Sequence, residues 1–489
     1  MSSVAFDNSC LPRAAASEPP SGRLISATEI RFSEIISALS VALDITQGQP
    51  EGHCMRSALI GMRLAEELHL PTTDRSALFY ALLLKDLGCS SNAAKMAYLF
   101  GADDRAVKRS IRMVDLTRPS DAVKHCWRHC APGGSKIDKL LKMAAMVRSG
   151  AEGARKIAQV RCERGAEIAR ALQLPEATAT AILHLDEHWD GQGFPCGLKG
   201  ENISLLGRIC CLAQTVEVFF TAYGLNSALE VARARRSRWF DPQLVDSLLT
   251  LKRDSAFWSR LRSDDLPGEV APWEPEETVL LADEPCLDRV AAAFARVVDA
   301  KSPWTYQHST RVAEIAVGMA RQFSVSDELE RDIRRAGLLH DIGKLGVSSL
   351  ILDKPGKPTD EEFDEIRKHP DYTQQILQQI DAFGTLADVA AAHHERLDGR
   401  GYHRRMEQDQ IPWVARVLAV ADICEALSAQ RPYRDALPWQ RIEDILLRDS
   451  GTGLDPDCVE ALRHSQERQQ LVSRVECQLT EIDRLVSEL

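Results

Sequence analysis

The chain has 489 residues, enough for about three domains of ~150 residues or two larger ones. Hydrophobic residues make up 44% and charged residues 27%, which excludes a fibrous or wholly disordered chain and is typical of a soluble globular protein. The formal net charge of -11 argues against a general nucleic-acid coat, since such a protein needs a broad basic surface. We therefore expect no nucleic-acid partner, and an anionic substrate would need a local basic pocket.

The first 26 residues are rich in Ser, Pro and Ala and are expected to form a flexible tail. They lack a basic start followed by an apolar run, so no secretory signal peptide is predicted. The longest apolar stretch, Ala77 to Leu84, is far shorter than the ~20 residues of a membrane span. The 13 cysteines are dispersed and include no Cys-x-x-Cys pair, which favours reduced thiols. We expect a cytoplasmic protein with no membrane partner.

From about Ala27 onward, almost every segment shows the apolar spacing of a helix. In the segment that follows His308, for example, apolar residues recur at steps of three and four. The alternation typical of strands is scarce, and residues 277–282 are the main exception. The sequence therefore predicts a mostly α fold.

A break in composition runs from Ser263 to Pro285, where four prolines and many acidic residues are unsuited to a regular helix. We interpret this stretch as a linker between two halves. The predicted organisation is a tail at 1–26, a first domain at 27–262, a linker at 263–285 and a second domain at 286–489.

The two halves look like one unit repeated, because four blocks of the first recur in the same order in the second. The matched blocks are His53–Arg56 with His308–Arg311, Leu78–Gly88 with Ile333–Gly343, Leu185–Pro195 with His393–His403, and Ile209–Phe219 with Val417–Leu427. The first copy is about 47 residues longer, and the extra residues fall at about 89–155. We therefore expect two tandem helical bundles, the first with an insertion.

The second half concentrates groups that bind metal ions: six of the 13 histidines lie between His308 and Asp422. Neighbouring residues on a helix diverge by about 100°, so the pairs His340-Asp341 and His393-His394 can each reach two metals. Imidazoles and carboxylates on inward faces are costly to bury unless something binds them. One such histidine is more typical of a hydrogen-bonded core residue, but seven such groups favour a metal centre. Asp341 is the natural bridging carboxylate.

Several short motifs of the second half belong together. They are His308, HDIGK at 340–344, His369-Pro370, HHERLDGRGY at 393–402, Ala421-Asp422 and RPYR at 431–434. This set resembles the HD-GYP family of the HD phosphohydrolase superfamily over about residues 301–462. The resemblance implies a helical bundle with a two- or three-metal centre that typically hydrolyses cyclic di-GMP. The implied metal ligands are His308, His340, Asp341, His369, His393, His394 and Asp422. Lys344, Arg431 and Arg434 fall where the family holds substrate phosphates.

Two positions depart from the family pattern. Some members have a Glu four residues before the first His that helps to hold a third metal, but Trp304 stands here, so we expect two metals. The Gly-Tyr-Pro of the family is Gly401-Tyr402-His403 in this chain. That loop has been linked to substrate preference and to partner contacts. The change to His403 therefore leaves the substrate and the partners open.

The chemistry agrees with the resemblance. Two metals can lower the pKa of a bridging water and clamp a phosphodiester. Ligands that are imidazoles and carboxylates without thiolate favour Fe or Mn, with Zn and Ni as alternatives. Asp341 and Lys344 are the expected catalytic residues, since Lys344 is placed to neutralise developing negative charge. Arg431 and Arg434 offer forked donors to phosphate oxygens.

The expected reaction is hydrolysis of cyclic di-GMP to the linear dinucleotide or on to GMP. One alternative is a phosphohydrolase of another nucleotide, such as a different cyclic dinucleotide. The alternative from a different class is a non-catalytic signalling scaffold. Signalling proteins and a second copy of the chain are candidate partners.

The first half retains only part of the ligand set. His53 and Asp86 survive, but the other ligand positions align with Lys85, Cys162, Leu185, Asp186 and Gln214. These residues cannot hold two metals, so we predict a catalytically dead copy that serves as a regulatory, dimerising or docking module or as structural support. The insertion contains one further cluster, HCWRHC at 125–130, which could form a small metal site but is more typical of a helix with chance His and Cys.

Overall fold

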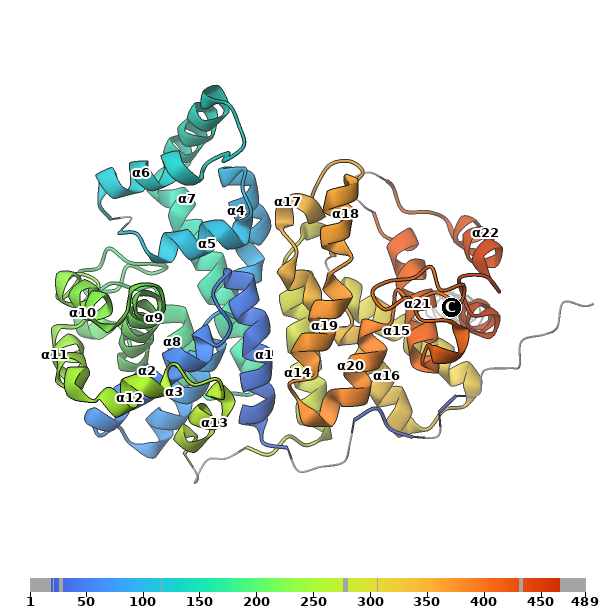
Figure 1. Cartoon of the computed structure of the whole chain (residues 1–489), viewed down its shortest axis with the longest axis horizontal. Coiled ribbons are helices and arrows are strands. Elements are labelled where there is room, and N and C mark those ends of the chain that lie inside the picture. The colour runs from blue at the N-terminus through green and yellow to red at the C-terminus, as the bar shows by residue number, and fades with distance from the viewer. Residues whose placement is uncertain are drawn as a thin grey trace, which may run out of the picture.

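The computed structural model describes residues 19–20, 22–25, 30–115, 117–275, 280–305, 307–430 and 434–466. These residues fold into helices and connecting loops, and the β pairing found among them is limited to isolated bridges. This confirms the predicted mostly α fold. Figure 1 shows the helices of residues 30–262, the N-terminal half, beside those of residues 284–466, the C-terminal half.

The N-terminal half contains twelve α-helices and three short 3-10 helices among its described residues. They are α1 Phe32–Gln47, α2 His53–Glu67, α3 Thr72–Leu84, η1 Cys89–Asn92, α4 Ala93–Phe100, α5 Asp104–Arg112, α6 Pro119–His129, α7 Lys136–Ala171, α8 Glu176–His184, η2 Gly200–Asn202, α9 Leu205–Tyr223, α10 Leu225–Ala234, α11 Pro242–Thr250, η3 Leu251–Arg253 and α12 Ser255–Arg260. Two short helices follow in the predicted linker, α13 Leu266–Val270 and η4 Ala271–Trp273.

The C-terminal half is built in the same way from helices joined by short turns. Its elements are α14 Glu284–Asp299, η6 Pro303–Thr305, α15 His308–Ala320, η7 Arg321–Phe323, α16 Asp327–Leu339, η8 Ile342–Gly346, α17 Ser349–Leu352, α18 Asp360–Ile366, α19 His369–Leu377, η9 Asp381–Phe383, α20 Gly384–Ala391, η10 Gln408–Gln410, α21 Trp413–Ser428 and α22 Trp439–Asp449. Residues 456–466 are also helical.

The break between α16 and η8 places the HDIGK motif. Ser326 caps α16 by accepting the backbone N–H of Leu329 at 3.2 Å. The helix ends at Leu339, so His340 and Asp341 lie at the break and not within a helix as expected. Glycine is required at 343, because a Cβ there would lie 2.0 Å from the carbonyl oxygen of His369, on the first residue of α19.

The predicted insertion at about 89–155 corresponds to η1, α4 to α6 and the first part of α7. α7 is 36 residues long and begins with a capping box at Ser135 and Asp138. Figure 1 shows α6 and the start of α7 projecting from the N-terminal half. A second, small apolar cluster holds this region together, formed by Met96, Phe100, Ala102, Val107 and Cys130.

The predicted tail and linker contact the helices where the structure describes them. Leu24 and Ile25 are buried, and their backbone N–H groups donate to the Asp332 carboxylate in α16 at 2.8 and 3.3 Å. In the linker, buried Glu274 accepts hydrogen bonds from Ser33 at 2.7 Å and Tyr80 at 2.5 Å. Both segments therefore pack onto the helices. Of the predicted tail at 1–26, the structure describes residues 19–20 and 22–25.

The stretch at 277–282 was the predicted exception to the helical pattern. Residues 277–279 lie outside the described part of the chain. Leu281 forms an isolated antiparallel bridge with Arg31, and the backbone N–H of Phe32 donates to the Leu280 carbonyl at 2.8 Å. This pairing joins the end of the linker to the start of α1.

The buried apolar residues form one large connected core that includes helices of both halves. Two independent tandem bundles therefore stay a prediction. Among the helices that the structure describes, one, α9, is long and apolar enough to cross a membrane, but 78% of its apolar stretch is buried within the protein. That burial is typical of a core helix.

Candidate metal centre

The seven predicted ligands come from five separate places in the C-terminal half and meet in one buried cluster. His308 begins α15, His340 and Asp341 lie between α16 and η8, His369 begins α19, His393 and His394 follow α20, and Asp422 lies within α21. Six of them are less than 10% exposed, and His394 is partly exposed. Three groups drawn from these seven residues bring their ligand atoms within 4.8 Å of one another.

Asp341 lies at the centre of this cluster. Its Oδ2 atom is 3.1 Å from Nε2 of His308 and 3.2 Å from Nε2 of His340. Its Oδ1 atom is 3.3 Å from Nε2 of His369 and 3.7 Å from Nε2 of His393. One carboxylate therefore faces two groups of imidazoles with its two oxygens, as a bridging carboxylate must.

Asp422 and His394 extend the two groups. Oδ1 of Asp422 lies 3.3 Å from Nε2 of His308, and Oδ2 of Asp422 lies 3.9 Å from Nδ1 of His394. His308, His340 and Asp422 form one candidate ligand group, and His369, His393 and His394 form another.

The imidazole rings are held in the orientation that metal binding requires. Nδ1 of His340 donates to the carbonyl of Gly337 at 2.7 Å, since a carbonyl oxygen can only accept. His369 and His393 donate in the same way to the carbonyls three residues before them, at 2.7 and 2.6 Å. With Nδ1 protonated, each Nε2 carries a lone pair that points into the cluster.

Without a cation, this arrangement would leave lone pairs facing one another. Nε2 of His369 and Nε2 of His393 are 3.3 Å apart, and both rings donate their only proton elsewhere. Nε2 of His340 and Oδ1 of Asp341 are buried and make no hydrogen bond. Buried acceptors without a donor are costly, and divalent ions would satisfy all of them. The residues therefore fit a metal centre.

Burial keeps the imidazoles of His369, His393 and His394 neutral. His308 differs, because burial alone would lower its pKa but hydrogen bonds with Asp341, Asp422 and Glu425 raise it well above its usual range. Burial, and then the neighbouring His369, lowers the pKa of His394 to about 3. Burial also lowers the pKa of His393 and of His369. Burial alone would raise the pKa of Asp341, but His340 and Lys344 hold it well below its usual range. Neutral imidazoles beside an ionised carboxylate are the protonation states that metal ligands need.

Glu425 is a supporting residue that the sequence analysis missed. Its carboxylate is fully buried and contacts Nδ1 of His308 at 2.5 Å and Arg311 at 2.6 Å. It thereby orients the His308 ring toward Asp341. The signal was present in the sequence, because Glu425 lies three residues after Asp422 and Glu217 stands at the matched place in the first half.

The predicted phosphate contacts have different surroundings. Nζ of Lys344 lies 2.5 Å from Oδ2 of Asp341, with its side chain 20% exposed at the edge of the cluster. The Arg434 guanidinium instead donates to backbone carbonyls, including those of Ala426 at 2.7 Å and Leu427 at 2.9 Å, near the end of α21. Arg431 lies outside the described residues.

A cleft of about 700 Å³ opens beside the cluster and is lined in part by the loop after the HHE motif. Tyr402 lines the cleft and also lies against the cluster, since its ring centroid is 4.7 Å from that of His394. The basic residues of the lining are Arg367, Lys368, Arg400 and Arg405. The cleft therefore supplies the local positive charge that an acidic protein needs to bind an anion.

These basic residues differ in their pairing. Arg367 lies 3.1 Å from Asp364 and Lys368 lies 2.5 Å from Glu365. No acidic side chain of the described residues pairs with Arg400 or Arg405, so both guanidinium groups are available to a ligand.

The corresponding place in the N-terminal half is occupied by cationic side chains. Lys85 donates to Asp86, and Arg161 donates to Asp186, all within one cluster. Arg112 of the insertion lies 3.5 Å from Asp86 and 3.3 Å from Asp186. Among the described residues, the groups able to hold a metal all lie in the C-terminal half.

The structure corrects one match made from the sequence. A Cβ at Gly88 would meet the carbonyl of Arg161, just as a Cβ at Gly343 would meet the carbonyl of His369. Arg161 therefore occupies the place of His369, where the sequence alignment put Cys162. The guanidinium of Arg161 enters the cluster in place of an imidazole.

The HCWRHC segment shows no metal group among the described residues. Nε2 of His125 is 2.8 Å from Oγ of Ser110, and the His125 and His129 rings stack at 4.6 Å. A hydrogen bond with Cys130, and then one with His125, lowers the pKa of Cys126 to about 5. The His and Cys side chains of this segment are therefore engaged with one another and with Ser110.

Comparisons with known proteins agree with this geometry. The sequence profile of the HD domain family matches residues 139–244 and 292–458. The chain is 42% identical over 432 residues to 3'3'-cGAMP-specific phosphodiesterase 3 of Vibrio cholerae, covering 88% of this chain and 94% of that protein. It is 43% identical over 145 residues to a cyclic di-GMP phosphodiesterase of Pseudomonas aeruginosa, covering 29% of this chain and 34% of that protein.

A solved structure extends the similarity to the whole fold. The crystal structure of a cyclic GMP-AMP-specific phosphodiesterase of V. cholerae matches with a TM-score of 0.62 and 38% identity. The match covers 90% of this chain and 98% of that one, so it includes helices of both halves.

Proposed function

The chain belongs to the HD domain family and is a phosphodiesterase of cyclic dinucleotides, and from this premise we propose that its substrate is 3'3'-cGAMP. The observation that carries the proposal is the extent of the similarity. A 3'3'-cGAMP-specific enzyme matches 88% of this chain, including its N-terminal half, whereas the cyclic di-GMP enzyme of P. aeruginosa matches 29%. The alternative substrate of the sequence analysis, a different cyclic dinucleotide, is therefore favoured over cyclic di-GMP.

We assign the metal ligands as two groups joined by Asp341. His308, His340 and Asp422 would hold one ion, and His369, His393 and His394 would hold the other. Two divalent ions would supply Lewis-acid activation of water and of the phosphodiester, with Fe or Mn preferred over Zn or Ni by this donor set. The support for this assignment is the set of Nε2 atoms that face Asp341 from both sides.

Lys344 is assigned to the attacked phosphate. Its ammonium lies at the edge of the cluster and touches the same carboxylate oxygen that faces His308 and His340. From there it can donate to a phosphate oxygen and neutralise charge that develops during cleavage. Arg434 is assigned a positioning role, because its guanidinium holds the carbonyls at the end of α21 and not a free site.

The basic cleft is assigned to the rest of the cyclic dinucleotide. Arg400 and Arg405 would pair with the second phosphate, and the Tyr402 ring would pack against a base. His403, which replaces the proline of the family motif, lies in the same lining and is 3.2 Å from Oε1 of Gln374. This residue gives the cleft a polar group that a proline would lack.

The N-terminal half is proposed to be a degenerate copy of the same unit that lost its metals. Lys85 and Arg161 occupy two ligand places, and one HD domain profile matches part of each half. We retain the proposals that the chain acts in the cytoplasm, binds signalling proteins and forms homo-oligomers.

A paired turnover assay tests the substrate. The full-length protein, purified without oxygen and analysed for metal, is given 3'3'-cGAMP or cyclic di-GMP at matched concentrations. We expect kcat/KM at least about tenfold higher for 3'3'-cGAMP, which corresponds to ~1.4 kcal/mol of discrimination. Equal rates, or faster cleavage of cyclic di-GMP, would contradict the proposal. The Asp341→Ala variant, assayed in parallel, controls for a contaminating enzyme.

A further inference from the structure

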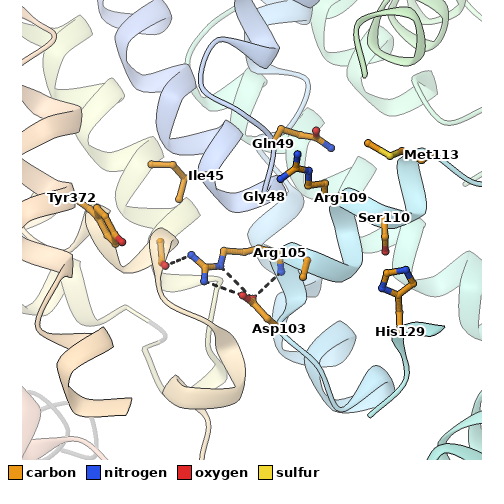
Figure 2. Close-up of a pocket in the computed structure, with 12 residues that line it drawn as sticks. Ile45, Gly48, Gln49, Asp103, Arg105, Arg109, Ser110, Met113, His129 and Tyr372 are labelled. Atoms are coloured by element: carbon orange, nitrogen blue, oxygen red, sulfur yellow. Dashed lines mark hydrogen bonds and ion pairs between the residues drawn. The ribbon is translucent and has the colours of Figure 1, made fainter. Parts of the chain in front are cut away.

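A groove of about 620 Å³ lies between the two halves, away from the metal centre's own cleft (Figure 2). One wall comes from the end of α1 with Ile45 and Gln49, and another from α5 with Arg105 and Arg109. Tyr372 of α19 lines it from the C-terminal half. A volume of this size is typical of sites for small organic ligands.

The groove presents hydrogen-bond donors that lack partners. Gln49 is 9% exposed, and its Nε2 atom is buried without a hydrogen bond. Arg109 has no acidic partner among the described residues, and Figure 2 shows its guanidinium beside Gln49. A buried amide donor and a free guanidinium are complementary to an anion that offers several acceptors.

The acidic residue of the lining does not cancel this preference. Asp103 is already paired with Arg105, at 2.9 Å between Oδ2 and Nη2 and 3.2 Å between Oδ1 and Nε. The unmatched charge of the groove is therefore positive. Apolar and ring surfaces complete the lining at Ile45, Met113, His129 and Tyr372, and they suit a ligand with a planar part.

The groove is connected to the HDIGK segment by direct hydrogen bonds. The Arg105 guanidinium donates to the carbonyl of Gly346, at the end of η8. Next to it on α5, the Asp104 carboxylate accepts the backbone N–H of Ser349 at 3.0 Å and lies 3.7 Å from Nζ of Lys301. Lys301 in turn donates to the carbonyl of Leu345 at 2.9 Å. A shift of α5 would therefore move the turn that carries Asp341 and Lys344.

We propose that this groove is a regulatory site for a nucleoside monophosphate, and that occupancy is transmitted to the metal centre through α5 and η8. The phosphate would bind Arg109 and Gln49, and the base would lie against the apolar and aromatic lining. The choice of a nucleotide over another small anion rests on the proposed function, whose products are nucleotides.

Hydrogen–deuterium exchange on the full-length, metal-loaded protein tests the site without depending on turnover. GMP, AMP and inorganic phosphate are added separately at equal concentrations. We expect GMP or AMP to slow exchange in residues 44–49 and 103–113 and to alter it in 342–349. Protection confined to 364–405, the cleft beside the metal centre, would overturn the proposal. Equal protection by inorganic phosphate would overturn the assignment to a nucleotide.

Calorimetric titration with the same nucleotide gives a second readout. Arg109→Ala should weaken binding at the groove by about tenfold, the effect of losing one charge-assisted hydrogen bond. Arg448→Ala is the matched control, because Arg448 is also an exposed helical arginine without a partner in the described structure but lies on α22. Titrations of Arg109→Ala that coincide with those of the wild type would overturn the site, whether or not the protein hydrolyses 3'3'-cGAMP.

Discussion

Lys85 and Asp86 form an ion pair whose two side chains are fully buried in the N-terminal half. In the C-terminal half, the matched residues are the His340 imidazole and the Asp341 carboxylate, which face a cluster of further imidazoles. Burial alone would raise the pKa of Asp86, but Lys85, Arg112 and Arg161 hold it well below its usual range. Fixed cations thus supply in one half the positive charge that metal ions are proposed to supply in the other.

The first prediction concerns Asp341. Asp341→Ala should lose both metals and all turnover, because the two oxygens of Asp341 lie between the two groups of imidazoles and face four of their Nε2 atoms. Elemental analysis after dialysis and an assay with 3'3'-cGAMP would measure the two effects, and circular dichroism would check that the protein is still helical. A variant that keeps two ions and normal turnover would refute the bridging assignment.

Asp86→Ala is the matched change in the other half, and the opposite result is expected. The metal content should stay at the wild-type level, because Asp86 contacts Lys85 and arginines. The free energy of unfolding should fall by about 3–5 kcal/mol, since buried cations lose their counter-charge. Denaturant titration would measure the loss. Release of metal by this variant would mean that the N-terminal half holds an ion after all.

Lys344→Ala should keep both metals and cleave more slowly. Lys344 contacts a carboxylate oxygen and no imidazole, so its loss removes a charge-assisted contact worth about 1.5–3 kcal/mol, or roughly ten- to a hundredfold in rate. Steady-state kinetics with metal analysis on one sample would separate the two effects. Loss of metal from this variant would contradict the assignment.

Glu425→Gln should weaken the metal held by His308. The carboxylate of Glu425 orients that ring, and loss of such support typically costs about 10–100-fold in metal affinity. Competition with a chelator would measure the affinity. Glu217→Gln, the matched change beside His53, should leave metal affinity unchanged, and an equal effect of the two variants would argue against a specific role for Glu425.

The same Glu217 makes stability depend on acid pH. Burial would raise the pKa of Glu217, but His53 and then Arg56 lower it to about 2, whereas an unfolded Glu titrates near pH 4.5. Because the folded value is the lower one, this stabilisation is complete above pH 4.5 and is lost as the pH falls toward 2. Glu217→Gln should therefore lower the free energy of unfolding at neutral pH and flatten its decline between about pH 4.5 and 2. Denaturant titrations at several pH values would measure the free energy of unfolding of both proteins. An equally steep decline with falling pH in the variant and the wild type would contradict the prediction.

The positions of the candidate ligands along the helices could be read from the sequence. His308 begins α15, the segment whose apolar residues recur at steps of three and four, and Asp422 lies in α21, within one of the repeated blocks. Spacing is local information, and backbone hydrogen bonding within a helix expresses it directly. The break after Leu339 was missed because it depends on the packing of α19 against Gly343.

By itself, then, the sequence determined the helical class, the clustering of His and Asp in the second half and the loss of that pattern in the first. Only the tertiary structure decided which side chains replace the lost ligands and how the halves touch. Arg161 reaches Asp186 from α7, Arg112 reaches Asp86 from the insertion, and Arg105 reaches Gly346 across 241 residues. Such contacts join segments that no periodicity relates, because they depend on where long, flexible cationic side chains find a buried carboxylate or carbonyl once the helices have packed.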